Sequence, residues 1–210
     1  MSEIYRRILT GIISGVLFFY VYFYFPLTFS LLLLMILFFI LFLEWPRLIS
    51  PTLLKFWFIT PIYPIFPVLC LLYLQWSYRD VSRIIPLYPF LVAWIFDTGS
   101  YFSGNFLGYH KICPKVSPKK SWEGLFGGAL GVLVFNFILF KNKGVLFILS
   151  ASVLLVIIAF LGDIFVSLLK RQAKIKDSGN ILPGHGGLLD RFDSVFFVVL
   201  VVVCYLLVDC

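Results

Sequence analysis

Charged residues are scarce in this sequence, and their scarcity determines the solvent in which the chain can fold. Asp, Glu, Lys and Arg make up 13% of the 210 residues, whereas a soluble globular protein has about 25%. Hydrophobic residues reach 61%, and the mean hydropathy is +1.03. The composition excludes an ordinary soluble domain and indicates an integral membrane protein.

Cysteine and histidine are too few to build a disulfide or zinc framework. The four cysteines include no CxxC pair, so we assign them no role. His110 and His185 are the two histidines, and their wide separation argues against a zinc site. A cleavable signal peptide is not indicated either, because the apolar run 8–25 is long and ends in aromatic residues. We expect this run to be a retained membrane span.

Apolar stretches fill most of the chain, and seven of them have roughly the 20 residues that a helix needs to cross a hydrocarbon core. They cover residues 8–25, 27–43, 53–74, 84–104, 122–140, 145–169 and 194–208. The sequence therefore predicts an all-α, polytopic transmembrane helical bundle of about seven spans. Pro61, Pro64 and Pro67 predict a kink or a break in the third span.

Basic residues predict how these spans are oriented. With a cytoplasmic N-terminus, 13 of the 17 Lys and Arg residues fall on the cytoplasmic side, which is the bias expected of a membrane protein. The loops around residues 105–121 and 170–193 then both face the cytoplasm. The net charge of +7 reflects this orientation and attraction to anionic lipids, so we predict no nucleic-acid partner.

Glycines recur at a spacing of four residues in two of the spans. The pairs are Gly11 with Gly15, Gly124 with Gly128, and Gly127 with Gly131. Small residues at this spacing allow two helices to approach closely. We expect these glycines to serve helix packing.

Four acidic residues lie at or inside the ends of predicted spans: Asp97, Asp163, Asp190 and Asp193. Ionisable groups at membrane depth are costly and indicate function. At 100° per residue, Asp163, Ser167, Lys170 and Lys174 would fall within a sector of about 60° on one helix face. The sequence thus predicts a polar stripe that leads from the membrane into the following loop.

The loop at residues 176–193 is rich in glycine and in charge. Glycines such as Gly184, Gly186 and Gly187 leave backbone N–H groups able to turn toward an anion. The positive charges of Lys170, Arg171, Lys176 and Arg191 would suit phosphates. The carboxylates of Asp163, Asp190 and Asp193 would suit Mg²⁺. An ordinary cytoplasmic loop would explain each residue singly, but glycine density, alternating charge and a membrane-embedded acid together favour a site.

A second polar segment covers residues 97–104 and 117–124. Asp97 either faces a polar cavity or pairs with a lysine of a neighbouring segment. Lys119 and Lys120 are either a phosphate clamp or headgroup anchors. His185 is either an acid–base group or a backbone hydrogen-bond partner, and we keep it as a binding candidate.

The motifs from Ser167 to Asp193 closely resemble the signature of the phosphatidate cytidylyltransferases, also called CDP-diacylglycerol synthases. The segments 97–101 and 117–124 and the pair Gly162-Asp163 are similar to the other motifs of that family, in the same order. The resemblance covers about residues 94–194. Two departures are Val166, where the family has an acidic residue, and Ser121, where threonine is more usual.

This resemblance implies transfer of a cytidylyl group from CTP to phosphatidate, which yields CDP-diacylglycerol and pyrophosphate with the help of Mg²⁺. The expected catalytic residues are Asp163, Asp190, Lys170, Arg171, Lys176 and Arg191. The expected substrate-binding residues are Ser167, Asp97, Ser117, Lys119, Lys120, Gly184, His185, Gly186 and Gly187. The expected metal ligands are Asp163, Asp190 and Asp193.

The implied protein is a multi-pass enzyme of a bacterial inner membrane, with its active site facing the cytoplasm. Residues 1–93 would form N-terminal spans, and residues 94–210 a catalytic transmembrane region with two cytoplasmic motif loops. A second cation and the oligomeric state stay open, with a homodimer as one option. Two other functions also stay open: a CTP-dependent lipid kinase of the polyprenol type, and an ion-coupled transporter.

Overall fold

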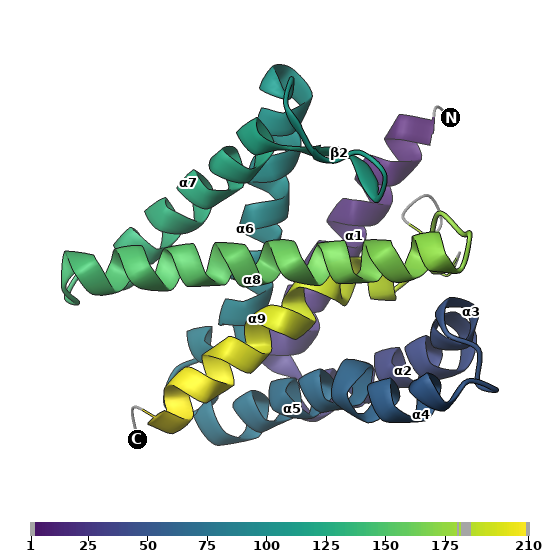
Figure 1. Cartoon of the computed structure of the whole chain (residues 1–210). Coiled ribbons are helices and arrows are strands. Elements are labelled where there is room, and N and C mark those ends of the chain that lie inside the picture. The colour runs from purple at the N-terminus through teal and green to yellow at the C-terminus, as the bar shows by residue number, and fades with distance from the viewer. Residues whose placement is uncertain (1–2, 180, 182–185, 209–210) are drawn as a thin grey trace. The chain divides into compact units, whose positions relative to one another are not determined.

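The computed structural model describes residues 3–179, 181 and 186–208 (Figure 1). Nearly all of its regular structure is helical, and a short strand pair is the exception. The elements follow in chain order as α1 (Glu3–Tyr24), α2 (Pro26–Phe39), η1 (Ile40–Glu44), α3 (Trp45–Leu48), α4 (Leu54–Thr60), η2 (Pro61–Ile65), α5 (Phe66–Tyr78), α6 (Ile84–Leu107), β1 (Lys111–Cys113), β2 (Ser117–Ser121), α7 (Trp122–Leu139), α8 (Val145–Gln172) and α9 (Leu189–Val208).

The chain forms two compact units. Unit 1 comprises Met1–Val81 and Leu169–Phe192, and unit 2 comprises Ser82–Leu168 and Asp193–Cys210. The last turn of α8 and the first turn of α9 therefore belong to unit 1, and the rest of both helices belongs to unit 2. The division expected from the motifs, between residues 93 and 94, stays a prediction.

Five helical segments within the described residues are long and apolar enough to cross a membrane. They are Pro26–Leu48, Leu54–Tyr78, Trp122–Leu139, Val145–Gln172 and Leu189–Val208. The apolar part of α1, Gly11–Tyr24, is shorter, and the polar residues 97–100 interrupt the apolar character of α6. The fold is that of an all-α membrane protein, while the count of seven spans and the cytoplasmic N-terminus stay predictions.

In unit 1, the proline-rich segment breaks its helix as predicted. Tyr63 has φ −149° and ψ 116° within η2, outside the helical region. Trp45 is fully buried, and its indole Nε1 donates a hydrogen bond of 2.7 Å to Thr60 Oγ1 just before the break. The rings of Trp45 and Tyr63 lie 5.5 Å apart. These contacts fasten the end of the second predicted span to the third.

In unit 2, glycines allow α6 and α7 to lie side by side (Figure 1). A Cβ atom added at Gly99 would lie 2.8 Å from the carbonyl oxygen of Gly127, closer than real Cβ contacts. A Cβ at Gly128 would lie 2.7 Å from the backbone oxygen of Phe96. The predicted packing role is thus confirmed for Gly127 and Gly128 of α7. A Cβ atom at Gly15 in α1, by contrast, would have nothing within 4 Å.

A polar chain also ties three helices of unit 2 together. Tyr88 on α6 donates a hydrogen bond of 2.8 Å to Asn136 Oδ1 on α7. Asn136 Nδ2 donates in turn to Ser152 Oγ on α8 at 2.9 Å. The Ser152 hydroxyl donates to the carbonyl of Ile148 at 2.7 Å. Each of these buried polar groups is satisfied, as an apolar environment requires.

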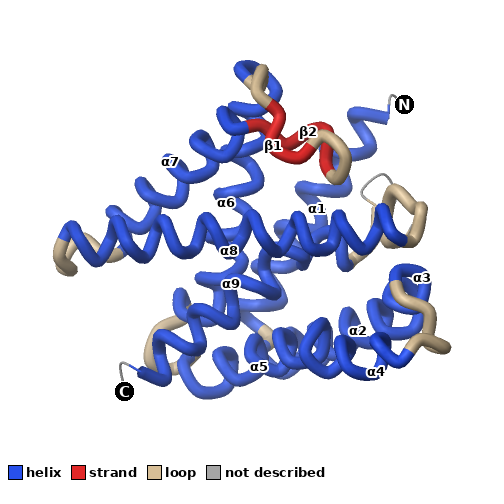
Figure 2. The backbone as a smooth tube through the Cα atoms, in the orientation of Figure 1, coloured by secondary structure: helices blue, strands red, loops and turns tan. Residues whose placement is uncertain are grey.

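The segment between α6 and α7 forms an antiparallel hairpin of β1 and β2, drawn in red in Figure 2. Lys111 lies opposite Ser121, and Cys113 lies opposite Ser117. Ser121 then caps α7, because its Oγ accepts a hydrogen bond of 3.2 Å from the backbone N–H of Gly124. Successive strand residues face opposite sides, so Lys119 is exposed while Lys120 turns inward.

Candidate functional site

In unit 2, Lys120 and Asp163 form an ion pair that joins β2 to α8. The Lys120 and Asp163 side chains are 16% and 22% exposed, so most of each charge is removed from solvent. Ser167, one turn later on α8, donates a hydrogen bond of 3.3 Å to Asp163 Oδ1. The structure therefore brings together three residues that the sequence analysis assigned to one site.

Two more predicted carboxylates belong to this group, which we call the acidic cluster: Asp97, Asp163 and Asp193 around Lys120. Asp193 is buried in α9, and the charges of Asp163, Asp97 and Lys120 act on it electrostatically. One of its oxygens accepts a hydrogen bond of 2.8 Å from the N–H of Ser194. The acidic cluster thus places three carboxyl groups near the ammonium group of Lys120.

Close helix packing supports the acidic cluster. A Cβ atom at Gly162 would lie 2.7 Å from the carbonyl oxygen of Asp193, so the glycine before Asp163 lets α8 approach α9. The Lys120 ammonium lies 5.2 Å from the ring centre of Phe160 and 5.9 Å from that of Phe96. Aromatic faces at these distances attract a cation and hold the Lys120 ammonium at Asp163.

In unit 1, Lys170 and Asp190 form a second ion pair, which joins the last turn of α8 to the first turn of α9. The Lys170 Nζ and Asp190 Oδ1 atoms lie 2.8 Å apart, and the two side chains are 13% and 10% exposed. The other oxygen of Asp190 accepts hydrogen bonds from the N–H groups of Ser178 at 3.0 Å and Gly187 at 3.2 Å. Asp190 thus joins the two described ends of this loop, residues 177–179 and 186–188, which we call the motif loop.

The glycines of the motif loop have distinct roles in the described residues. Gly186 has φ +83°, a conformation that favours glycine. Gly187 is buried, and its N–H, predicted to face a phosphate, donates to Asp190. The predicted binding residues Gly184 and His185 lie outside the described residues.

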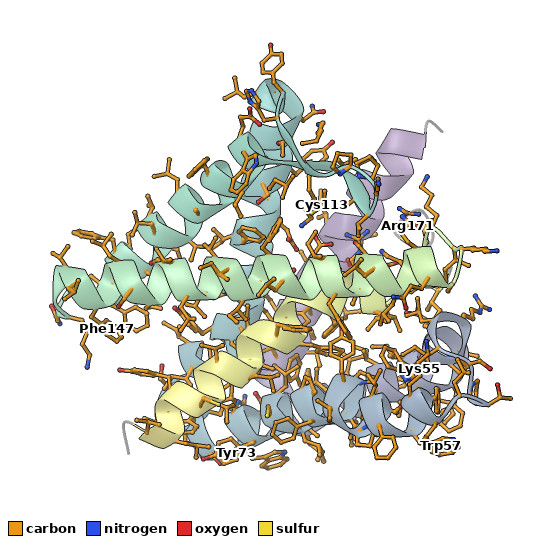
Figure 3. All side chains as sticks on the ribbon, in the orientation of Figure 1. Lys55, Trp57, Tyr73, Cys113, Phe147 and Arg171 are labelled. Carbon is orange, nitrogen blue, oxygen red and sulfur yellow. The ribbon has the colours of Figure 1, made fainter. Side chains whose placement is uncertain are left out.

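The other predicted basic residues lie on the surface. Arg171, Lys176 and Arg191 are exposed in unit 1. The Arg171 guanidinium, labelled in Figure 3, donates to the carbonyl oxygen of Ile175 at 3.4 Å. In unit 2, Lys119 is exposed on β2 and Ser117 is half-buried. Direct pairing with a predicted carboxylate is seen for Lys120 and Lys170.

The predicted helix face ends earlier than expected. Helix α8 runs through Asp163, Ser167 and Lys170 but ends at Gln172. Lys174 follows with φ +57°, so its inclusion in the polar stripe was wrong. The loop turns there because the N–H of Ile175 bonds back to the carbonyl of Lys170 at 2.9 Å.

Glu44 is a residue that sequence reasoning missed. Its side chain is fully buried at the end of η1. Its two oxygens accept hydrogen bonds from the N–H groups of Leu188 at 2.7 Å and Leu189 at 2.8 Å. An acid at the end of an apolar span was a usable signal, because ionisable groups at membrane depth indicate function.

The carboxyl groups of the acidic cluster are of the type that binds a divalent cation, but they do not lie close enough together to bind one unaided. Within either unit, the described residues contain no group of three His, Cys, Asp or Glu side chains close enough to hold a metal ion. Mg²⁺ commonly uses one or two protein carboxylates, several waters and the phosphates of a substrate. The carboxyl groups beside Lys120 therefore fit Mg²⁺ that arrives together with a phosphate ligand.

An apolar cavity of about 520 Å³ also lies in unit 2. Its lining includes Tyr88, Phe140, Leu155 and Val202, together with Phe147, which is labelled in Figure 3. No described residue of the predicted site contributes to this lining. A wall with so few polar groups is unsuited to phosphate, so the polar chemistry belongs to the two ion-paired groups.

Comparison with known proteins agrees with the motifs. The sequence profile of the cytidylyltransferase family matches residues 51–209. The phosphatidate cytidylyltransferase of Haemophilus influenzae is 46% identical over 117 residues, which are 52% of this chain and 41% of that protein. The enzymes of the same name from Staphylococcus haemolyticus and Staphylococcus aureus are each 45% identical over 116 residues, which are 53% of this chain and 45% of theirs. The chain therefore spans about half the length of the curated relatives it matches.

Proposed function

Because the chain belongs to the cytidylyltransferase family, we propose that it transfers the cytidylyl group of CTP to phosphatidate, producing CDP-diacylglycerol and pyrophosphate. The observation that carries this proposal is the high identity to enzymes named phosphatidate cytidylyltransferase. Two partly buried lysine–carboxylate pairs among the motif residues support it. The reaction would take place at the cytoplasmic face of a bacterial inner membrane.

The chemistry requires alignment and charge neutralisation more than a protein nucleophile. An oxygen of the phosphatidate phosphate attacks the α-phosphorus of CTP, and the bond from that phosphorus to the oxygen bridging to the β-phosphorus breaks. Pyrophosphate leaves with the electron pair. Phosphoryl-type transfer rests mainly on positioning and electrostatic stabilisation, which is what paired lysines and carboxylates can provide.

Each basic residue has a part in this proposal. Lys120 and Lys170 already hold their ammonium groups beside carboxylates, and phosphate oxygens would compete for the same hydrogens. The exposed Arg171, Lys176 and Arg191 would bind the outer phosphates of CTP, since guanidinium groups bind phosphate in a bidentate manner. The charge of both substrates would thereby be offset before they react.

Mg²⁺ is part of the proposal. Asp163 and Asp193 would hold it, since their carboxyl groups both belong to the acidic cluster. Asp190, the third expected ligand, is engaged by Lys170 and two backbone N–H groups. When bound, the ion would neutralise the phosphate oxygens of CTP.

Doubly labelled CTP tests the proposed reaction. The purified chain in lipid nanodiscs is incubated with phosphatidate, Mg²⁺ and CTP that carries one label in cytosine and another in the γ-phosphate. Cytidylyl transfer places the cytosine label in the lipid and leaves the γ label in pyrophosphate. A lipid that carries only the γ label would instead establish a kinase, and an unlabelled lipid would refute cytidylyl transfer to phosphatidate.

A further inference from the structure

The structure assigns a role to Glu44: we propose that this buried carboxylate is a positioning residue, which holds the motif loop and the start of α9 so that Asp190 meets Lys170. The inference rests on the proposed function, because it explains how one half of the predicted site keeps its geometry. Glu44, the motif loop, Lys170 and Asp190 all belong to unit 1.

The hydrogen bonds of Glu44 are the first observation. Oε1 accepts from Leu188 N at 2.7 Å, and Oε2 accepts from Leu189 N at 2.8 Å and from the Ser178 hydroxyl at 3.0 Å. The N–H groups at a helix start have no partner within the helix, and the helix dipole favours a negative charge there. Glu44 therefore caps α9 from a segment 144 residues away in sequence.

The second observation is that Ser178 connects Glu44 to the ion pair. The Ser178 side chain donates to Glu44, and its backbone N–H donates to Asp190 Oδ2. Asp190 Oδ1 in turn binds the Lys170 ammonium. A continuous chain of hydrogen bonds thus runs from Glu44 through Ser178 and Asp190 to Lys170, and a displacement of Glu44 would reach Lys170 in three steps.

The backbone of two glycines packs closely against the Glu44 carboxylate. A Cβ atom at Gly179 would lie 2.7 Å from Glu44 Oε1, and one at Gly187 would lie 2.8 Å from the same oxygen. The glycines of the motif loop therefore make room for the carboxylate. Trp45, the next residue, is buried and hydrogen-bonded to Thr60, which anchors Glu44 from the other side.

Glu44→Gln is the informative variant, because glutamine has almost the same shape but a single acceptor oxygen. The glutamine oxygen can then accept a hydrogen bond from the N–H group of Leu188 or of Leu189, and the glutamine NH₂ group faces the N–H group of the other residue. Ser178→Ala removes one weaker bond and leaves the carboxylate in place. Asp80→Asn is the matched control, since Asp80 is an exposed acid of the same unit.

Two measurements on the purified full chain test the role of Glu44. Hydrogen–deuterium exchange should show faster exchange at the amides of Leu188 and Leu189 in Glu44→Gln, a smaller effect in Ser178→Ala, and none in Asp80→Asn. Turnover per folded molecule should fall by about 10–100-fold in Glu44→Gln, as it does when other residues that hydrogen-bond to the groups of a site, and so orient them, are replaced. The apparent KM for CTP should change much less, because Glu44 touches no substrate.

Unchanged exchange at Leu188 and Leu189 would overturn the proposal, and so would normal turnover despite faster exchange. If Glu44→Gln fails to fold, Ser178→Ala decides by the same two readings. A wild-type chain that forms no labelled lipid would refute the proposed function, while the exchange comparison would still decide whether Glu44 holds the loop.

Discussion

The ion pair between Lys170 and Asp190 makes a quantitative prediction, because its two members have different additional partners. Asp190→Asn can keep its remaining oxygen on the N–H groups of Ser178 and Gly187, but its NH₂ group then faces the Lys170 ammonium. Lys170 is left with a charge that is 13% exposed and has lost its carboxylate. Lys170→Met instead leaves the Asp190 carboxylate with two N–H donors.

The expected magnitudes follow from this difference. Breaking a buried ion pair by removing one partner costs about 3–5 kcal/mol, and we expect Asp190→Asn to fall in that range. Lys170→Met should cost about 1–3 kcal/mol, because charge-assisted hydrogen bonds still satisfy Asp190. The double variant should cost less than the sum of the two, since no unpaired ammonium remains, with a coupling of about 2 kcal/mol.

Unfolding of the four proteins in mixed micelles of mild detergent and SDS measures these energies. The double-mutant cycle isolates the pair, and the turnover of each variant is measured alongside. Additive effects, with a coupling below about 0.5 kcal/mol, would refute the reasoning that Lys170 and Asp190 act as one unit.

Three further predictions follow from packing and charge within the two units. Gly99→Ala should lower the free energy of unfolding by about 1–3 kcal/mol, because the added methyl group would overpack against α7. Gly15→Ala has open space around the added methyl group and should raise that free energy by up to about 1 kcal/mol. Thermal melts of both variants provide the comparison, and equal effects would contradict the packing. Asn136→Leu should destabilise the chain by about 1–3 kcal/mol, because the buried Tyr88 hydroxyl loses its acceptor; an unchanged melting temperature would disprove this. Lys120→Met should raise the apparent KM for CTP about tenfold or more, as one charge-assisted contact to phosphate is lost; steady-state kinetics check this, and an unchanged KM would remove Lys120 from the binding site.

The helical segments follow from patterns that are local in sequence, whereas the ion pairs of the candidate site are tertiary contacts. Apolar runs and prolines predicted the helical segments and the break near Tyr63, because hydropathy and backbone geometry act over short stretches. The sequence assigned Lys120 to substrate binding and Asp163 to the metal, and the pairing of these two side chains is a finding of the structure. Which side chains meet Lys120 depends on tertiary packing.

Three features of the structure escaped prediction, each for its own physical reason. The hairpin of β1 and β2 lacks the alternation of apolar and polar residues that indicates a strand. Glu44 binds backbone N–H groups, and a backbone donor leaves no mark in the sequence that would name its acceptor. The end of α8 before Lys174 is set by a bond from Ile175 N to the carbonyl of Lys170, which residue spacing alone does not reveal.

The central claim is that cytidine monophosphate moves to the lipid, and the stoichiometry of the products tests it most directly. The purified chain in nanodiscs that contain phosphatidate is incubated with CTP and Mg²⁺. The lipid product is identified and quantified by mass spectrometry, and the amount of pyrophosphate released is measured. CDP-diacylglycerol and pyrophosphate should form in equal amounts, and the Asp163→Asn variant should form neither product. Phosphorylated lipid with CDP as the other product, or full activity in Asp163→Asn, would contradict this claim.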